Sequence, residues 1–328
     1  MEKTIDVLAV GNAIVDVFST CDDDFLDQQS IGKGMMNLVD AERSAALYAD
    51  LRQSEKMSGG SAANTAVGIA ALGGAAAFAG RVHDDPLGHA FCDDIKNASV
   101  AFNNPPHVNG SPTASSIILI TPDAIRSMNT YLGACIEFQP EDILRQDAAA
   151  AKIIYLEGYL FDAPAGPAIF ARAAALAAEF GCKISLSLSD PWCAERHRDA
   201  LTNFVINHVD VLFSNENEVS SLCDAPVEEA TRLLMDNVGE VIVTHGPKGA
   251  FAGNGADQIE VAARPLGKVI DTTGAGDLFA AGYLYGRTNG YSLQDSAMIA
   301  SLVAGEIISH LGARPQADLR ALVAQAVA

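Results

Sequence analysis

The chain has 328 residues, of which 49% are hydrophobic and 19% charged, so it is long enough to bury a large core. Its 21 basic and 41 acidic residues give a formal net charge of −20, which argues against nucleic acid or an anionic membrane surface as a partner. No apolar run approaches the length of a membrane span, the first residues do not form a leader, and the six cysteines contain no C-x-x-C pair. We therefore expect a cytoplasmic protein with reduced thiols.

Strands and helices alternate along the chain. The pattern predicts strands over 5–10, 76–80, 153–156, 184–188, 211–213 and 241–244. It predicts helices over 41–51, 62–72 and 167–180, and two more that start at Gly276 and Leu293. Such alternation is typical of an α/β fold with a mainly parallel sheet that helices cover on both faces. We expect a single domain over 1–328.

Two stretches, 13–39 and 101–131, break this rhythm. They alternate apolar and polar residues and contain Gly, Pro and Asn at intervals, which favours short β-strands. Ligands of open α/β sheets bind at the carboxyl ends of the strands. We therefore predict that both stretches form a small β-lid over that edge of the sheet.

The most informative segment is 271–284, with the sequence DTTGAGDLFAAGYL. The apolar pair at 269–270 predicts the end of a strand, and a run of helix formers follows the glycines. Glycines admit an anion closely and a helix N-terminus is positive, so the helix start offers an anion hole of three main-chain N–H groups, those of Gly274, Ala275 and Gly276. Asp277 in the first helical turn would repel a resting phosphate, so we expect it to face the nucleophile as a general base. The alternative is an Asp that only caps the helix.

A second glycine-rich turn opens the helix predicted at 62–72. Segment 57–74 places Gly59 and Gly60 before the helix and Asn64 near its start. Small residues make up this helix, so another element should pack closely against it. Asn64 can offer a ligand both a donor and an acceptor.

Together, these two segments closely resemble the paired signatures of the ribokinase/PfkB family of sugar and nucleoside kinases, and the resemblance covers essentially the whole chain. It implies a ribokinase-like three-layer sandwich with a small β-lid, and a kinase that uses ATP and Mg²⁺ with Asp277 as the base. In the family, an Asp after the first strand binds sugar hydroxyls, and Asp16 matches it here, although a plain turn Asp is the alternative. The implied acceptor site comprises Asn12, Asp16, Gly59, Gly60 and Asn64.

The resemblance also covers the nucleotide and magnesium sites. Asn215 and Glu218 match the family's N-x-x-E element, which holds magnesium through water, although a polar helix start would look the same. The ATP site would comprise Asn215, Thr244, Gly246 and Gly249. Lys248 in the same loop is either a countercharge to phosphate or an ordinary loop lysine.

Three further positions gain a role only from the resemblance. The carbonyls of Asp271 and Thr273, with loop 309–314, would hold a monovalent cation such as K⁺. Arg126, between the lid strands, would either reach the transferred phosphoryl group or remain an exposed hairpin arginine. His83 stands where the family often has a glycine, so the local shape of its loop is left open.

Other enzyme classes lack their motifs in this chain. There is no G-x-x-x-x-G-K-[ST] and no G-x-G-x-x-G after the first strand, which argues against a P-loop enzyme and a nicotinamide oxidoreductase. His197, Arg198 and Asp199 resemble the catalytic loop of protein kinases, but the Asn spacing is wrong. The seven histidines show no zinc spacing.

The choice of phosphoryl acceptor depends on few residues. Kinases of free ribose usually have a polar Asn two positions before the first Asp, whereas this chain has Ile14, which looks more like the adenosine kinase branch. Met35, Met36 and Leu38 would offer an apolar wall to a nucleobase, or merely fill gaps. Leu160 stands where that branch often has a stacking aromatic residue, which weakens the nucleoside interpretation.

We therefore expect a kinase that phosphorylates a primary hydroxyl of a nucleoside. The alternatives are a kinase of a free sugar such as ribose and a non-catalytic nucleotide-binding regulator. A regulator has no use for a general base, so the presence of Asp277 argues against it. We expect a monomer or a homodimer.

Overall fold

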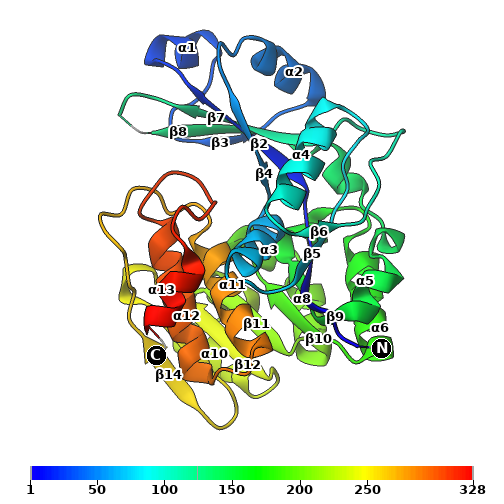
Figure 1. The fold of residues 1–328 in the computed structure, drawn as a ribbon, viewed down its shortest axis with the longest axis vertical. Coiled ribbons are helices and arrows are strands. Elements are labelled where there is room, and N and C mark those ends of the chain that lie inside the picture. Colours follow the sequence, from blue (N-terminus) through cyan, green and yellow to red (C-terminus); the bar gives the residue numbers. More distant parts are fainter. Residues whose placement is uncertain (1, 124, 327–328) are drawn as a thin grey trace.

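The structure, a computed structural model, describes residues 2–123 and 125–326. Its body is a nine-stranded sheet in the order β14-β13-β12-β11-β10-β9-β1-β5-β6 (Figure 1). The strands from β12 to β6 pair in parallel, and β13 and β14 add an antiparallel edge. Their bounds are β1 Ile5–Val10, β5 Ala76–Ala79, β6 Ala101–Phe102, β9 Ala151–Glu157, β10 Lys183–Ser187, β11 Val211–Asn215, β12 Glu240–Thr244, β13 Ala250–Gly253 and β14 Gln258–Val261.

Helices cover both faces of this sheet and make three layers. One face shares a core with α3 (Ser61–Ala71), α4 (Pro86–Asn97), α11 (Ala275–Thr288), α12 (Leu293–Ile307) and α13 (Leu319–Ala326). The other shares a core with α5 (Arg145–Ala150), α6 (Gly166–Phe180), α7 (Pro191–Arg196), α8 (Arg198–His208), α9 (Glu216–Cys223) and α10 (Val227–Met235). Short 3₁₀ helices are η1 (Gly133–Glu137), η2 (Pro140–Asp142), η3 (Gly158–Asp162) and η4 (Gly246–Lys248). The predicted α/β class with a mainly parallel sheet is confirmed.

A second, five-stranded sheet stands above the body in the order β3-β8-β7-β2-β4 (Figure 1). Its strands are β2 (Ile14–Thr20), β3 (Met36–Leu38), β4 (Glu55–Gly59), β7 (Ala114–Ile120) and β8 (Arg126–Tyr131). Helices α1 (Asp23–Gln28) and α2 (Ala41–Ala49) lie on its outer side. We call this unit the small sheet.

The small sheet uses most of the predicted lid, but the predicted boundaries are wrong in two places. Strand β6 pairs with β5 in the body, because Phe102 packs against Phe78 and Phe91 in the body core. Strand β4 pairs with β2 and belongs to the small sheet, although its first residues, Glu55 and Lys56, are both charged and show no apolar alternation. Closure of the small sheet over a ligand stays a prediction.

The strand end predicted at 269–270 is also wrong. Val269 and Ile270 are 50% and 55% exposed and lie in a loop. The main-chain N–H groups of Ile270 and Asp271 both point to one acceptor, the carbonyl of Ile308, so no strand ladder forms. Apolar side chains alone therefore do not define a strand here.

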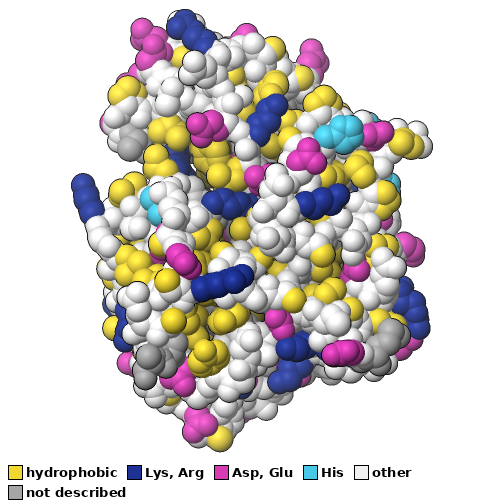
Figure 2. Space-filling model, in the orientation of Figure 1, with side chains coloured by type: hydrophobic (Ala, Val, Ile, Leu, Met, Phe, Trp, Pro, Cys, Tyr) yellow, Lys and Arg dark blue, Asp and Glu magenta, His cyan; other side chains and the backbone are white. Residues whose placement is uncertain are grey.

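Figure 2 shows hydrophobic and basic side chains along the waist between the small sheet at the top and the body below. This waist lies at the carboxyl edge of the large sheet, because β1 ends at Val10 and the chain enters the small sheet at Ile14. Of the helices in 2–123 and 125–326, none combines the length and the apolar character that crossing a bilayer would need.

Candidate active site

A cavity of about 400 Å³ opens at the carboxyl edge of the large sheet between the first turns of α3 and α11, and we call it the central cavity. These helices pack closely, as the small residues of α3 predicted, since a Cβ on Gly68 would lie 2.6 Å from the Cβ of Ala281. Of the predicted site residues, the cavity is lined by Gly60, Asn64, Asn215, Glu218, Thr244, Gly274, Ala275, Gly276 and Asp277. The predicted residues outside its lining are Asn12, Asp16, Gly59, Gly246, Gly249, Asp271 and Thr273.

Asp277 lies in the first turn of α11 and two neutral donors hold its carboxylate. The Ser61 hydroxyl donates to Oδ1 at 2.6 Å and the Asn64 amide donates to Oδ2 at 2.9 Å. Burial raises the pKa of Asp277, and the two hydrogen bonds lower it. Gly274 caps the helix with a φ of 77°, which favours glycine. No side chain caps the helix start, and the main-chain N–H of Ala275 donates to the carbonyl of Thr272 at 3.2 Å. This arrangement can hold an anion beside a base.

A buried glutamate that sequence analysis did not single out holds the start of α3. Both oxygens of Glu157 accept main-chain N–H groups at 2.8 Å, one from Asn12 and one from Ala62. Burial raises the pKa of Glu157 to about 7, and these hydrogen bonds lower it. The predicted Asn12 therefore meets Glu157 through its main chain. A Glu directly after an apolar strand was the available signal.

Asp16 lies on β2 beside Gly59 of β4. A Cβ on Gly59 would overlap the Asp16 carboxylate, so glycine is required there. Burial raises the pKa of Asp16 to about 7, against the lowering effect of Arg314 and Arg126, while Asp277 raises it further. Asp16 is therefore close enough to Asp277 and Arg314 for their charges to change its pKa, although it is not part of the cavity lining.

Asn215 and Glu218 also line the cavity and form a capping box on α9. The Asn215 amide donates to Glu218 Oε1 at 2.6 Å, and the main-chain N–H of Asn215 donates to Oε2 at 3.0 Å. Burial raises the pKa of Glu218 to about 7. Each carboxylate oxygen keeps a free lone pair, so the residue fits a magnesium ion held through water.

The predicted nucleotide loop contributes only Thr244 to the cavity lining. Gly249 is buried with a φ of 108°, and a Cβ there would overlap the carbonyl of Val261, so packing and backbone conformation together explain its glycine. Gly246 and Lys248 are exposed in η4. A nucleotide role for these three residues stays a prediction.

Asp271, Thr273 and Arg126 form one polar group between the small sheet and the body. Arg126 Nη1 lies 2.5 Å from Asp271 Oδ2 and donates to the Thr273 hydroxyl at 3.2 Å. The Thr273 hydroxyl in turn donates to Asp271 Oδ1 at 2.8 Å. The Asp271 carboxylate is thus already neutralised by an arginine, so a monovalent cation would rely on the main-chain carbonyls. Arg126 has only 12% of its side chain exposed, so it is not an exposed hairpin arginine.

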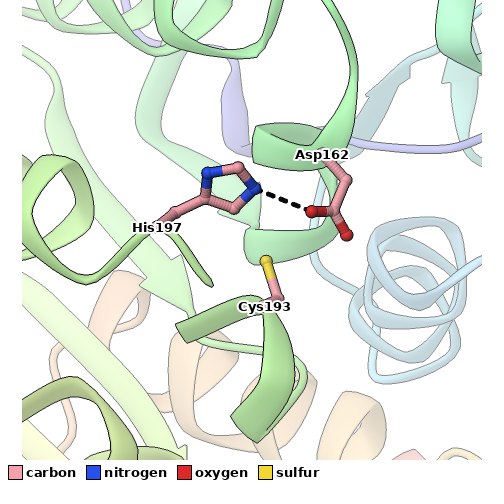
Figure 3. A group of neighbouring side chains, drawn as sticks. All are labelled: Asp162, Cys193 and His197. Atoms are coloured by element: carbon pink, nitrogen blue, oxygen red, sulfur yellow. Dashed lines mark hydrogen bonds and ion pairs between the residues drawn. The ribbon is translucent and has the colours of Figure 1, made fainter. Parts of the chain in front are cut away.

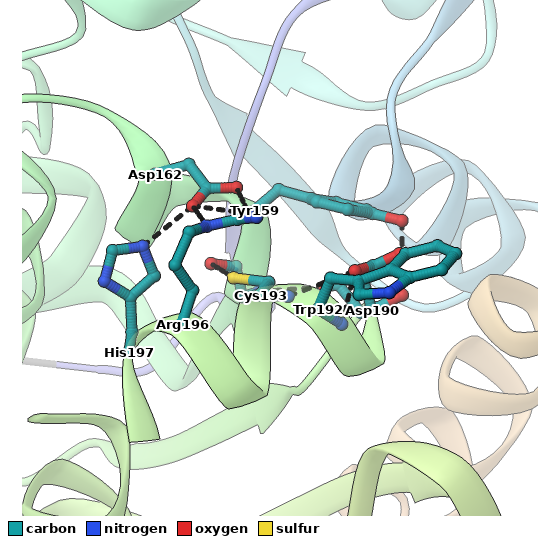
Figure 4. A network of polar contacts seen from close by, with 9 residues as sticks. Tyr159, Asp162, Asp190, Trp192, Cys193, Arg196 and His197 are labelled. Carbon is teal, nitrogen blue, oxygen red and sulfur yellow. Dashed lines mark hydrogen bonds and ion pairs between the residues drawn. The ribbon is translucent and has the colours of Figure 1, made fainter. Parts of the chain in front are cut away.

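An aromatic side chain does line the cavity, one position before the residue considered from sequence. Leu160 is fully buried in the body core, whereas Tyr159 is 40% exposed and lines the cavity. Figure 4 shows Tyr159 reaching from η3 toward the start of α7, where Asp190 and Trp192 lie. The Tyr159 hydroxyl donates to the carbonyl of Ser189 at 3.2 Å. Leu160 and Tyr159 are neighbours in the 3₁₀ turn η3, and their side chains point to different surroundings.

Asp162, Cys193 and His197 form a second polar cluster beside η3 (Figure 3). Asp162 is already engaged by Arg196 Nη2 at 2.7 Å and by His197 Nε2 at 2.7 Å. The Cys193 thiol donates to the carbonyl of Gly158 at 3.3 Å, and burial raises the pKa of Cys193 to about 12. A protonated thiol and a paired carboxylate do not suit a metal ion, so these contacts instead fix η3 to α7 (Figure 4).

Sequence analysis missed four further residues of the site: Ser61, Glu157, Tyr159 and Arg314. Ser61 follows the two glycines and could have been found as a hydroxyl in a ligand-binding turn. Arg314 lay within the loop considered for a cation, but its contacts with segments some 250 positions away in sequence give no local signal.

Comparison with known proteins shows several relatives that cover nearly the whole chain. Residues 29–319 match the pfkB family of carbohydrate kinases. The structure is similar to that of a probable sugar kinase from Rhizobium etli CFN 42, with a TM-score of 0.89 and 42% identity over 100% of this chain and 99% of that one. It is similar to that of an adenosine kinase from Sinorhizobium meliloti, with a TM-score of 0.88 and 42% identity over 98% and 99% of the two chains. The adenosine kinase of Saccharomyces cerevisiae is 29% identical over 332 residues, which are 94% of this chain and 96% of that protein.

Proposed function

Since the chain belongs to the pfkB family of carbohydrate kinases, we propose that it transfers the terminal phosphoryl group of ATP to the primary hydroxyl of a ribonucleoside, with adenosine preferred. Its kinase relatives make it a phosphotransferase that acts on a hydroxyl group. One observation carries the mechanism. Asp277 lines the central cavity beside the main-chain N–H groups that open α11.

In this reaction Asp277 accepts the proton of the attacking hydroxyl. Ser61 and Asn64 each donate to one of its oxygens, which orients the carboxylate and leaves lone pairs for the substrate. Burial raises the pKa of Asp277, which makes it a stronger base than an exposed carboxylate. The N–H groups of Gly274, Ala275 and Gly276 stabilise the negative charge on the transferred phosphoryl group.

We assign the phosphates of ATP to the cavity end formed by Asn215, Glu218 and Thr244. Bound magnesium would neutralise charge on the phosphates, and Glu218 would hold it through water. The net charge of −20 supports this requirement, because an acidic chain has few cations to offer a polyphosphate. We expect removal of magnesium by a chelator to abolish turnover.

Three features support a nucleoside as the acceptor. Tyr159 offers an aromatic ring at the cavity wall, which a base can stack on. Met36 and Leu38 of β3 are 58% and 66% exposed, so closure of the small sheet could bring apolar side chains over the base. Asp16 would accept from the ribose hydroxyls once that sheet closes.

Closure of the small sheet is open to a direct measurement. We expect amide hydrogen exchange in residues 14–59 and 114–131 to slow when adenosine binds, because closure excludes water from the transferred phosphoryl group. Exchange in the buried strands of the body serves as the control. Equal exchange with and without adenosine would contradict a closing lid.

A kinase of a free sugar is the second candidate, and the similarity to the probable sugar kinase from Rhizobium etli favours it. The nucleoside kinase and the sugar kinase can be distinguished by measuring kcat/KM for adenosine, other nucleosides, ribose and other sugars, with ADP release as the readout. Burial of an apolar group against a base contributes roughly 1.5–3 kcal/mol, which is enough to make adenosine the better acceptor. A higher kcat/KM for a free sugar would overturn the nucleoside assignment and leave the kinase assignment intact.

A further inference from the structure

Arg314 joins three segments of the site that lie far apart in sequence. It follows α12, and only 14% of its side chain is exposed. Its Nη2 donates to the carbonyl and the hydroxyl of Ser58, the latter at 2.6 Å, and lies 3.9 Å from Asp94 Oδ2. Its Nη1 donates to Asn64 Oδ1 at 3.3 Å. The guanidinium therefore forms hydrogen bonds both to the end of β4 and to the start of α3.

We propose that Arg314 is a positioning residue for the general base, because it fixes the one orientation of the Asn64 amide that donates to Asp277. This inference rests on the proposed function. A guanidinium contains only donors and a carboxylate only acceptors, so the amide between them has a single orientation that satisfies both. In that orientation Oδ1 faces Arg314 and Nδ2 faces Asp277 at 2.9 Å. In the flipped amide, the NH₂ group would face the donors of Arg314 and the oxygen would face the carboxylate of Asp277, so both hydrogen bonds would be lost.

The charges around Asp277 explain why an arginine is needed at this place. The negative charge of Asp277 raises the pKa of four neighbouring groups: Asp16 of β2, Glu157 of β9 and the phenols of Tyr155 and Tyr159. Arg314 provides the opposing positive charge, and it lowers the pKa of Asp277 and of Asp16. Burial lowers the pKa of Arg314 itself, whereas Asp94, Asp16 and Asp277 raise it. The positive charge of the arginine thus favours the ionised form of Asp277 without direct contact.

Two substitutions of Arg314 distinguish the effect of its hydrogen-bond geometry from the effect of its positive charge. Arg314→Ala should lower kcat by about 10–100-fold with the KM for ATP within about twofold, because a loosened base is misaligned with the hydroxyl. The acid limb of its kcat profile should move to higher pH, since the positive charge is gone. Arg314→Lys keeps the charge but cannot fork to both Ser58 and Asn64, so kcat should stay low while the acid limb stays near that of the wild type.

Arg287→Lys is the matched control, because Arg287 is a sheltered arginine at the other end of α11 and pairs with Glu240. It should reduce thermal stability and leave kcat per folded molecule and the acid limb unchanged. A loss of kcat in Arg314→Ala that only follows the unfolded fraction, with an unmoved acid limb, would overturn the proposal.

A second readout does not depend on the identity of the substrate. The carboxyl ¹³C resonance of Asp277, assigned by its loss in Asp277→Asn, can be titrated in the substrate-free protein. The proposal predicts a higher midpoint in Arg314→Ala than in the wild type and in Arg314→Lys. Identical midpoints in all three would overturn it. If the wild type phosphorylates neither nucleosides nor sugars, the proposed function fails while this titration still decides the role of Arg314.

Discussion

The two ends of α11 hold their carboxylates in different ways. At the last turn, Glu240 accepts from Arg287 Nη2 at 2.6 Å and from the Tyr283 hydroxyl at 2.7 Å. At the first turn, Asp277 accepts from the neutral side chains of Ser61 and Asn64 and lines a cavity. The first group is an ion pair at the amino edge of the sheet, and the second is a carboxylate held only by neutral donors at the carboxyl edge.

Because of this difference, we expect one end of α11 to contribute to stability and the other end to contribute to the reaction. Removing one partner of the ion pair leaves the other charge without a partner, so we expect this pair to act on stability. A carboxylate with neutral donors keeps a raised pKa and lone pairs that face the cavity, so it can take up a proton. We therefore expect substitutions at the two ends to affect different measurements.

The largest effect should come from Asp277→Asn. An amide cannot accept the hydroxyl proton, so kcat should fall by about 10²–10⁴-fold. The affinity for ATP should change by less than about twofold, because the anion hole uses main-chain groups. ATP affinity can be followed through the fluorescence of Trp192, which is the single tryptophan and lies near Tyr159. A weaker affinity for ATP with an unchanged kcat at saturating ATP would instead identify Asp277 as a helix cap.

Glu240→Gln tests the other end of α11. Breaking a buried ion pair should lower the free energy of unfolding by about 3–5 kcal/mol, measured by urea denaturation. The kcat of the folded fraction should not change. Glu260→Gln on the exposed edge strand β14 is the control and should have little effect. A fall in kcat without a loss of stability would contradict the division between the two ends.

Asp16→Ala should weaken binding of the acceptor and leave ATP binding intact. Loss of charged hydrogen bonds to the substrate hydroxyls costs about 1.5–3 kcal/mol, which corresponds to an acceptor KM about 10–150-fold higher. The KM for ATP serves as the internal control. An unchanged acceptor KM would remove Asp16 from the site.

The last prediction concerns the pH dependence of stability. The pKa of Asp16 is about 7 in the folded protein and near its ordinary value of 3.8 when unfolded, so between these values the folded state binds more protons. The contribution of Asp16 should therefore lower the free energy of unfolding as pH rises from 4 to 7, by at most about 1.4 kcal/mol per pH unit. Asp16→Asn should remove this part of the slope. Equal slopes in both proteins would contradict the burial of an ionisable Asp16.

Local sequence patterns predicted the parts of the site that depend on local structure. Gly274 and Gly60 precede helices that start where the glycines and helix formers indicated, and Asp277 and Asn64 follow from them. The paired strands of the small sheet were predicted in outline for the same reason, since alternation of apolar residues is a local signal.

Long-range contacts were not predictable in this way. Arg314 acts on residues some 250 positions away, and Glu157 holds two main-chain groups from separate segments. Tyr159 was overlooked because a 3₁₀ turn decides whether it or Leu160 faces the cavity. The exposed pair Val269 and Ile270 looked like a strand because hydrophobicity was the only signal available there.

The identity of the product tests the central claim most directly. ³¹P NMR can follow a mixture of the wild-type protein, ATP, magnesium and adenosine. Our account predicts ADP and adenosine phosphorylated on its primary hydroxyl in equal amounts, formed about 10²–10⁴-fold more slowly by Asp277→Asn. Binding of ATP with no phosphorylated product from any nucleoside or sugar would contradict the account and indicate a nucleotide-binding regulator.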